Sequence, residues 1–259
     1  MKRIGSFVVC ALFVVGMCQK PAVADVVDIY DGLGFDFSPL NTFFTGQGYT
    51  VNQLSSTFSS LAGANFVILS EPGTLSLSAG QLSTIDSYVD GGGRLLINSE
   101  WYPGFTSDIT STNTILTSLG SSIVNADTAS EPGYHDTSDI VVSPFTAGVT
   151  DVNYADTSSL SGGTALVFGN PVTDDGQEFI AYQGIGSGFV FVIADSDTAD
   201  NINSTTTNNN GVLYCDFGGL TCAATPSTVP EPGSIGLLFT AIAGAGLVLR
   251  KQLRGRRSV

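Results

Sequence analysis

Short apolar runs alternate with amphipathic segments in the first part of the chain. Runs of four to six mostly apolar residues, each followed by Gly, Pro or polar residues, indicate buried strands. These runs are Val26–Tyr30, Tyr49–Leu54, Phe66–Leu69 and Arg94–Ile97. Between the first two, Ser38–Phe44 is predicted to be a short helix with Pro39 at its first position. Alternation of strand and helix predicts a parallel sheet with helices on both faces.

The segment after Ser78 has the clearest helical signals. Ser78 and Gln81 have the spacing of a capping box. The apolar residues that follow fall on one face at helical spacing, and Gly91-Gly92-Gly93 ends the pattern. A further helix is predicted over Asn113–Leu119.

The second half of the chain is richer in strand patterns. The predicted strands are Ile140–Val142, Thr164–Phe168, Glu178–Tyr182 and Phe189–Ile193. The glycines of Gly184–Gly188 predict a hairpin between the last two. Because these glycines precede a strand and do not open a helix, they do not predict a phosphate-binding loop.

The first 24 residues have the pattern of a secretory signal peptide. Lys2 and Arg3 precede an apolar run that ends at Met17, and Ala22-Val23-Ala24 follows. The run is too short to span a membrane, and small residues at the first and third positions of the last triplet are typical of a cleavage site. Ala22 and Ala24 thus predict cleavage before Asp25, and a mature domain over residues 25–222.

The last 37 residues read as a second targeting segment. A linker over residues 223–229 is followed by Pro230-Glu231-Pro232, by an apolar run over residues 234–249, and by a cluster of five basic residues. At about 1.5 Å per residue, a helix over the run is about 24 Å long, enough for a single transmembrane helix where the bilayer thins. The basic cluster should stay cytoplasmic, so that the domain faces outward. A plain membrane anchor would show a similar apolar run.

This combination resembles the PEP-CTERM sorting signal, which spans residues 230–259 here. The resemblance implies recognition of Pro230, Glu231 and Pro232 by an exosortase, with processing near them. It also implies a Gram-negative bacterium that makes exopolysaccharide. The expected location is the cell surface or the extracellular matrix, after a transient stay in the inner membrane.

Charge and cysteines agree with export. Of 23 acidic residues only Glu231 lies outside the span from Asp25 to Asp216, and of nine basic residues only Arg94 lies inside it, so the domain carries 1 − 22 = −21. Such a surface excludes nucleic acid as a partner. Cys215 and Cys222 have the spacing of a disulfide that closes a short loop in an oxidising compartment.

A second resemblance concerns the domain itself. Residues 82–97, with a helix, a glycine turn and a strand, and residues 186–197, with a glycine turn, a strand and Asp195-Ser196-Asp197, are similar to class I glutamine amidotransferase-like domains. The resemblance implies an α/β fold of flavodoxin-like or amidotransferase-like type, with a mostly parallel sheet and flanking helices. An active member would have a cysteine on the turn after Arg94–Ile97. Here the turn reads Asn98-Ser99-Glu100-Trp101, so the activity is not implied.

Polar residues at strand ends are the candidate binding residues. Asp195, Asp197 and Asp200 follow a predicted strand and offer oxygen ligands for Ca²⁺, although the spacing is not that of an EF-hand and local hydrogen bonds would also explain them. Glu100 and Trp101 follow another strand and would line the same crevice, where the indole could stack on a sugar or simply pack in the core. The single histidine, His135, is predicted to lie in a solvated loop.

We therefore predict an exported, non-enzymatic binding or structural protein, with an exosortase, the membrane and matrix components such as exopolysaccharide as partners. No catalytic residue and no required cofactor are predicted. No free cysteine can pair with His135, and no Gly-x-Ser-x-Gly elbow is present. The alternative is a secreted hydrolase that acts on a matrix polymer or a peptide through a site built by loops.

Overall fold

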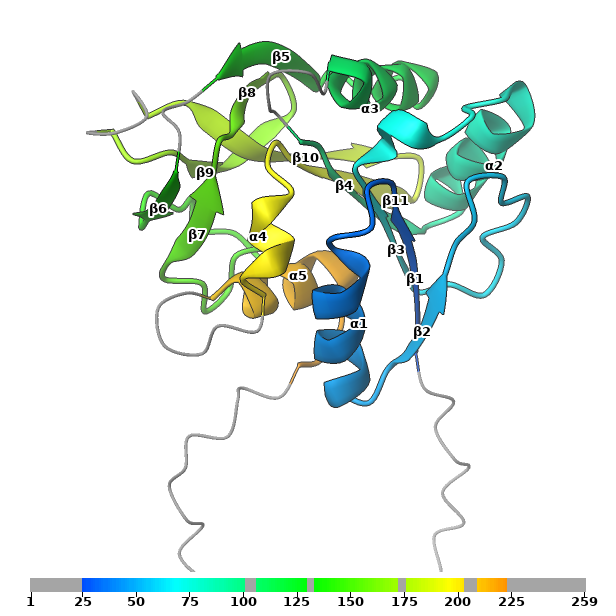
Figure 1. Cartoon of the computed structure of the whole chain (residues 1–259), viewed down its shortest axis with the longest axis horizontal. Helices are drawn as coiled ribbons and strands as arrows, with labels where there is room; N and C mark the ends of the chain where they lie inside the picture. Colours follow the sequence, from blue (N-terminus) through cyan, green and yellow to red (C-terminus); the bar gives the residue numbers. More distant parts are fainter. Residues whose placement is uncertain (1–24, 101–105, 130–132, 172–175, 203–208, 223–259) are drawn as a thin grey trace, which may run out of the picture. The chain divides into compact units, whose positions relative to one another are not determined.

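A seven-stranded sheet forms the centre of the computed structural model, which describes residues 25–100, 106–129, 133–171, 176–202 and 209–222 (Figure 1). Its order is β2-β1-β3-β4-β11-β10-β9. The strands are β1 (Val26–Asp31), β2 (Thr50–Gln53), β3 (Phe66–Ser70), β4 (Arg94–Asn98), β9 (Thr164–Phe168), β10 (Glu178–Ile185) and β11 (Gly188–Ile193). The first four and β11 pair in parallel, and β10 is antiparallel to both its neighbours. The predicted mostly parallel α/β sheet and the β10–β11 hairpin are confirmed.

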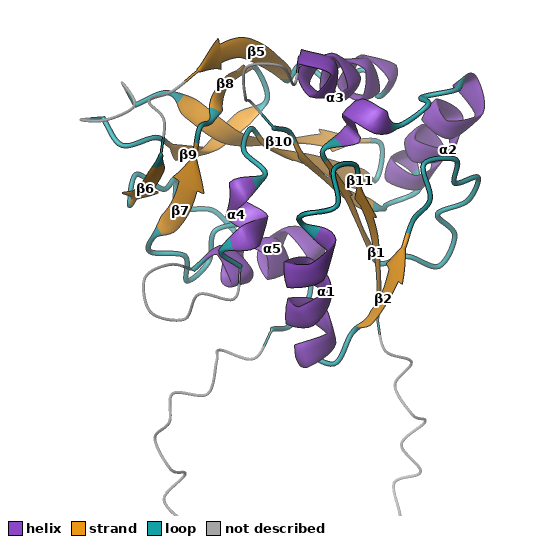
Figure 2. Cartoon of the chain, viewed as in Figure 1, coloured by secondary structure: helices purple, strands orange, loops and turns teal. Residues whose placement is uncertain are grey.

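Helices cover both faces of this sheet, as predicted (Figure 2). One face carries α1 (Phe37–Gly46), α4 (Asp197–Asp200) and α5 (Asn210–Gly218). The other carries α2 (Ala79–Asp90), α3 (Thr106–Ser118) and the short 3-10 helix η1 (Pro72–Thr74). The sheet is thus the middle layer of three.

Two small antiparallel pairs of strands lie beside the main sheet, and neither was predicted. They are β5 (Val124–Ala129) with β8 (Ser158–Ser161), and β6 (Tyr134–Thr137) with β7 (Val152–Ala155). The strand predicted at Ile140–Val142 is wrong: only Ile140 forms an isolated bridge, and Val142 is exposed. His135 lies on β6 opposite Tyr154 and is half-buried, so its prediction as a solvated loop residue is also wrong.

The core follows from the apolar runs. All five residues of β3 are buried, and Phe191 of β11 stacks on Phe217 of α5 with ring centroids 4.5 Å apart. Arg94, at the start of β4, donates to the carbonyl oxygens of Asp216 and Phe217 at 3.0 Å each. The domain's single basic side chain therefore satisfies the last carbonyls of a helix, where a cation is favoured.

Helix starts show where the local signals suffice and where they fail. The capping box of Ser78 and Gln81 is present, and α2 ends at the predicted glycines. In contrast, α1 starts at Phe37 after Asp36, not after Ser38. Asp36 gives no capping hydrogen bond because its carboxylate accepts one from Ser70 on β3. The helix predicted over Asn113–Leu119 begins seven residues earlier.

The described residues end close to a disulfide. Cys215 and Cys222 are joined by the predicted disulfide. The chain divides into two units, Met1–Leu220 and Thr221–Val259, and all the elements above belong to the first. Within the described ranges, no helix has both the length and the apolar character needed to cross a membrane. The predicted signal peptide, linker, PEP motif and transmembrane helix lie outside those ranges.

Candidate functional site

Acidic side chains gather where the parallel strands end. Asp31 ends β1, Glu71 follows β3, Glu100 lies two residues after β4, and Asp195 lies two residues after β11. The carboxyl ends of neighbouring parallel strands meet at one edge of a sheet, which is where open α/β sheets bind ligands. At this edge lies a pocket of about 190 Å³, the carboxyl-edge pocket. It is lined by Leu33, Phe35, Asp36, Glu71, Glu100, Asp156, Ser196, Asp197 and Asp200.

Ser196 links two buried glutamates across the pocket. Its hydroxyl donates to Glu100 Oε2 and lies 3.3 Å from Glu71 Oε1. A serine hydroxyl has one proton to donate, so a second hydrogen bond requires a proton on the other partner. The geometry therefore suits a state in which Glu71 is protonated and Glu100 accepts.

The electrostatics of the two glutamates agree with a retained proton. Burial, followed by the charge of Asp31, raises the pKa of Glu71 to about 8. Burial also raises the pKa of Glu100 to about 7, against the hydrogen bond from Ser196, which favours the charged form. Both groups thus titrate near neutrality, in the range used by general acids and bases.

Glu71 also fixes the loop that follows β1. Its Oε2 accepts from the backbone N–H of Leu33 at 3.0 Å, and its own N–H donates to the carbonyl oxygen of Asn98 at 2.9 Å. The backbone of Glu71 has φ 51°, a left-handed conformation that costs a non-glycine residue about 1 kcal/mol. Glu71 is therefore bound to the loop after β1 through its side chain and to the end of β4 through its backbone.

Two further buried carboxylates, those of Asp195 and Asp108, accept hydrogen bonds from backbone N–H groups next to the pocket. Asp195 is fully buried and accepts from the backbone N–H groups of Ala155 and Asp197, each at 2.9 Å. Asp108 of α3 accepts from the N–H of Glu100 and, at 2.8 Å, from that of Gly73. Burial raises the pKa of Asp108 to about 6 and that of Asp195 well above its usual value. These groups hold the strand ends in place.

The predicted cation ligands are brought together only in part. One oxygen each of Glu100, Asp195 and Asp197 lie within 4.8 Å of one another. Asp200, predicted as the third ligand, lies on α4 and lines the pocket without joining this trio. Both oxygens of Asp195 accept hydrogen bonds from backbone N–H groups. A Ca²⁺ site at these three carboxylates stays a prediction.

The other predicted site residues are placed as follows. Glu100 lines the carboxyl-edge pocket, whereas Trp101 lies outside the described residues, as do Ala22, Ala24 and Pro230–Pro232. Asp25 is the first described residue and is exposed. Sequence reasoning missed Asp36, Glu71, Asp108 and Ser196.

Comparisons with known proteins give structural likeness only. No protein-family model matches the chain, and no curated protein matches it significantly. Solved structures that resemble it include a GMP synthase-like protein from Thermoplasma acidophilum (14% identity, TM-score 0.49, 76% of this chain and 94% of that one). A ThuA-like protein from Bacteroides uniformis is similar at 11% identity and a TM-score of 0.49, over 79% of this chain and 94% of that one.

A β-galactosidase from Rahnella sp. R3 is also similar, at 15% identity and a TM-score of 0.47, over 75% of this chain. The present chain spans only 30% of the length of that enzyme. These likenesses are too distant to say what this chain binds or does.

Proposed function

We propose that the chain is an exported protein of the cell surface or the extracellular matrix, with a binding or structural role and no catalysis. The disulfide between Cys215 and Cys222 is the observation that carries the export proposal. Disulfides persist in exported proteins and are rare in the reducing cytosol. A bridge that closes so short a loop contributes about 2–3 kcal/mol.

The limits of the fold support the proposed processing. β1 begins at Val26, so cleavage before Asp25 removes no residue of the sheet. At the other end, α5 ends at Gly218 and the disulfide at Cys222, ahead of the proposed linker over residues 223–229. Both proposed cuts therefore spare every described element of the domain.

We further propose that residues 230–259 are a PEP-CTERM signal read by an exosortase. The support is the order of the parts: a proline-flanked motif, an apolar run and a basic end. The two prolines keep the segment extended, which suits binding in a protease groove. On this proposal the domain is left in a matrix that contains exopolysaccharide.

Mass spectrometry of the mature protein from the producing cells tests this function. We expect an N-terminus at Asp25 and loss of the basic tail. Replacing Pro230 and Pro232 by Ala should leave the tail attached, while Pro226→Ala in the linker should not. Recovery of the intact chain from the cytosol, leader included, would refute the proposal.

We also propose that the core is a non-catalytic member of the amidotransferase-like or flavodoxin-like group. The order of parallel strands and the edge pocket support this, and the position after β4 where such enzymes have a cysteine reads Asn98-Ser99-Glu100. A nucleophilic thiol is thus missing from the turn where that chemistry needs it.

One observation favours a hydrolase as the second candidate. Glu71 and Glu100 are joined through Ser196 in an open pocket and titrate near neutrality, as an acid and a base would. We expect the full chain not to turn over ester, peptide or glycoside substrates. Turnover that Glu100→Gln abolishes, with Asp86→Asn on the exposed side of α2 as the control, would establish the hydrolase instead.

A further inference from the structure

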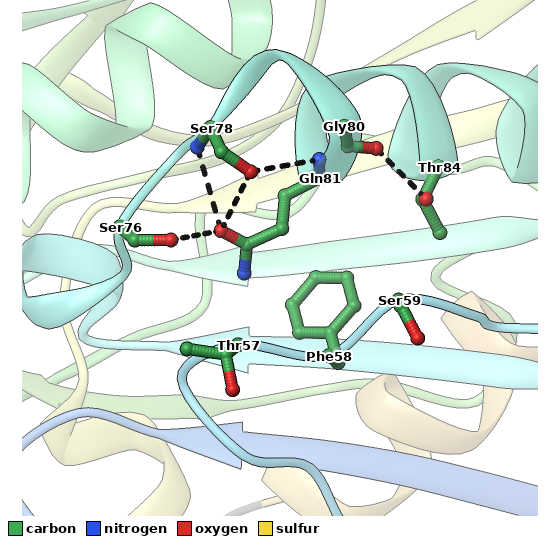
Figure 3. Close-up of a pocket in the computed structure, with 8 residues that line it drawn as sticks. All are labelled: Thr57, Phe58, Ser59, Ser76, Ser78, Gly80, Gln81 and Thr84. Carbon is green, nitrogen blue, oxygen red and sulfur yellow. Dashed lines mark hydrogen bonds between the residues drawn. The ribbon is translucent and has the colours of Figure 1, made fainter.

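A groove runs between α2 and the loop that joins β2 to β3. Two cavities, of about 440 and 350 Å³, adjoin there, since both are lined by Ser59 and Thr84 (Figure 3 shows the first). We call this the α2 groove, formed by Thr57–Ala62 of the loop and by the face of α2 that carries Gly80, Thr84 and Ser87. Each cavity has the size of a small-molecule site.

The α2 groove has no charged side chain in its lining. The carboxyl-edge pocket, in contrast, is lined by several carboxylates. The domain as a whole has a net charge of 1 − 22 = −21. A cationic ligand would find no carboxylate to pair with in the groove, and an anionic ligand would be repelled by the domain as a whole. The electrostatics therefore favour an uncharged ligand.

Hydroxyl groups on both walls are available to such a ligand. Within the described residues, the side chains of Thr57, Ser59, Ser83 and Ser87 make no hydrogen bond. Each hydroxyl can donate one hydrogen bond and accept two. In Figure 3 no dashed line joins Thr57 or Ser59 to another of the residues drawn, whereas Ser76 and Ser78 are bonded to Gln81.

The end wall of the groove is pre-formed. Gln81 makes three hydrogen bonds here: its backbone N–H donates to Ser78 Oγ at 3.3 Å, its side-chain Oε1 accepts from the hydroxyl of Ser76, and its Nε2 donates to the backbone carbonyl oxygen of Ser56 at 2.9 Å. The last bond ties the loop to α2. A ligand would therefore not have to order this wall, which lowers the cost of binding.

Each cavity also has one aromatic residue among its polar ones. Tyr88, which is half-buried, lines the second cavity, whereas Phe58 lines the first but is only 6% exposed and offers little ring surface. Hydroxyls that can donate and accept, together with the partly exposed ring of Tyr88, match a sugar, which has hydroxyls at its edge and C–H groups on its faces. We infer that the α2 groove binds an uncharged polyhydroxylated ligand, namely a short stretch of a neutral saccharide chain. The inference deepens the proposed matrix association and rests on it for the source of the ligand.

Affinity electrophoresis of the full chain tests this inference. The chain is solubilised in a polyoxyethylene detergent, which has no sugar headgroup, and is run in native gels that contain dextran, galactomannan or xylan. We expect at least one neutral polysaccharide to retard the protein, and the anionic polysaccharide alginate not to do so.

Variants at the junction of the two cavities locate the binding. Ser59 is exposed and lines both cavities, so Ser59→Trp should fill the junction and raise the apparent dissociation constant about tenfold or more. Ser55→Trp, on the same loop but outside both linings, is the matched control and should bind normally. Ser87→Trp should weaken binding from the helix side. An unchanged melting temperature shows that each variant is folded.

Three results would overturn the inference: no retardation by any of the neutral polysaccharides, retardation that Ser59→Trp and Ser87→Trp leave unchanged, or equal retardation by alginate. These results leave the export proposal untouched, because the mass of the mature protein tests that separately. Loss of processing with saccharide binding intact would refute export and spare the groove.

Discussion

Lowering the pH from 8 to 5, with a chelator present, is expected to raise the melting temperature of the full chain by about 10 °C. The cause is the pair of glutamates in the carboxyl-edge pocket. Burial raises the pKa of Glu71 to about 8 and that of Glu100 to about 7. Asp36 and Asp195, whose pKa values burial also raises well above normal, act in the same direction.

The sign follows from where the protons are bound. In the unfolded chain a glutamate ionises near pH 4.3, whereas in the fold these two keep their protons to about pH 7 and 8. Between those values the folded state binds more protons, so the free energy of unfolding falls as the pH rises. For each group, the free energy of unfolding changes by at most about 1.4 kcal/mol per pH unit. Solvent in the open pocket makes the change smaller. The gain should level off below about pH 4.5.

Thermal unfolding between pH 4 and 8, followed by circular dichroism, checks this prediction. The double variant Glu71→Gln/Glu100→Gln should show a weaker dependence, since neither side chain can ionise. Asp86→Asn, at an exposed position of α2 outside the pocket, should retain the dependence of the parent chain. A melting temperature that is constant or rises between pH 5 and 8 would contradict the burial of ionisable glutamates at this edge.

The central strands of the main sheet could be predicted because they are buried on both faces. Such strands are short continuous apolar runs, and Phe66–Leu69 and Phe189–Ile193 are read from sequence without ambiguity. β8 is different: it reads Ser-Ser-Leu-Ser and pairs only with β5. Its pairing depends on where the rest of the chain places it, a long-range effect that no local pattern contains.

The candidate site could be predicted only in part. The rule that polar residues after parallel strands meet at one edge found Glu100, Asp195 and Asp197. The same rule applies to Glu71 after β3. Because Pro72-Gly73 follows, Glu71 was interpreted only as part of a turn. Asp108 gave no signal, because the start of α3 was predicted seven residues too late.

Ser196 shows the remaining limit. Its role depends on the positions of Glu71 and Glu100, which lie 125 and 96 residues away in sequence. Nothing near Ser196 in sequence indicates that it lies between two glutamates. The sequence predicted at which edge of the sheet these polar residues gather, but it did not predict the hydrogen bonds between them.

Replacing Gly32 by Ala is expected to lower the free energy of unfolding by about 3 kcal/mol. A Cβ at this position would lie 1.9 Å from the carbonyl oxygen of Glu71 and 2.9 Å from Thr74 Oγ1. The first neighbour is backbone and cannot rotate away. Either the loop after β1 or the end of β3 must move, and the hydrogen bond from Leu33 to Glu71 would be lost with the movement.

Urea unfolding at pH 6 measures the loss, and Gly46→Ala is the matched control. A Cβ on Gly46, the last residue of α1, would meet no atom within 4 Å, so that variant should be as stable as the parent or slightly more stable. A Gly32→Ala variant within about 1 kcal/mol of the parent would show that Glu71 is not held against the β1 loop. Because the contact of Glu71 with Ser196 requires this placement, the same result would also remove the physical basis for the high pKa of Glu71 and hence for the expected pH dependence.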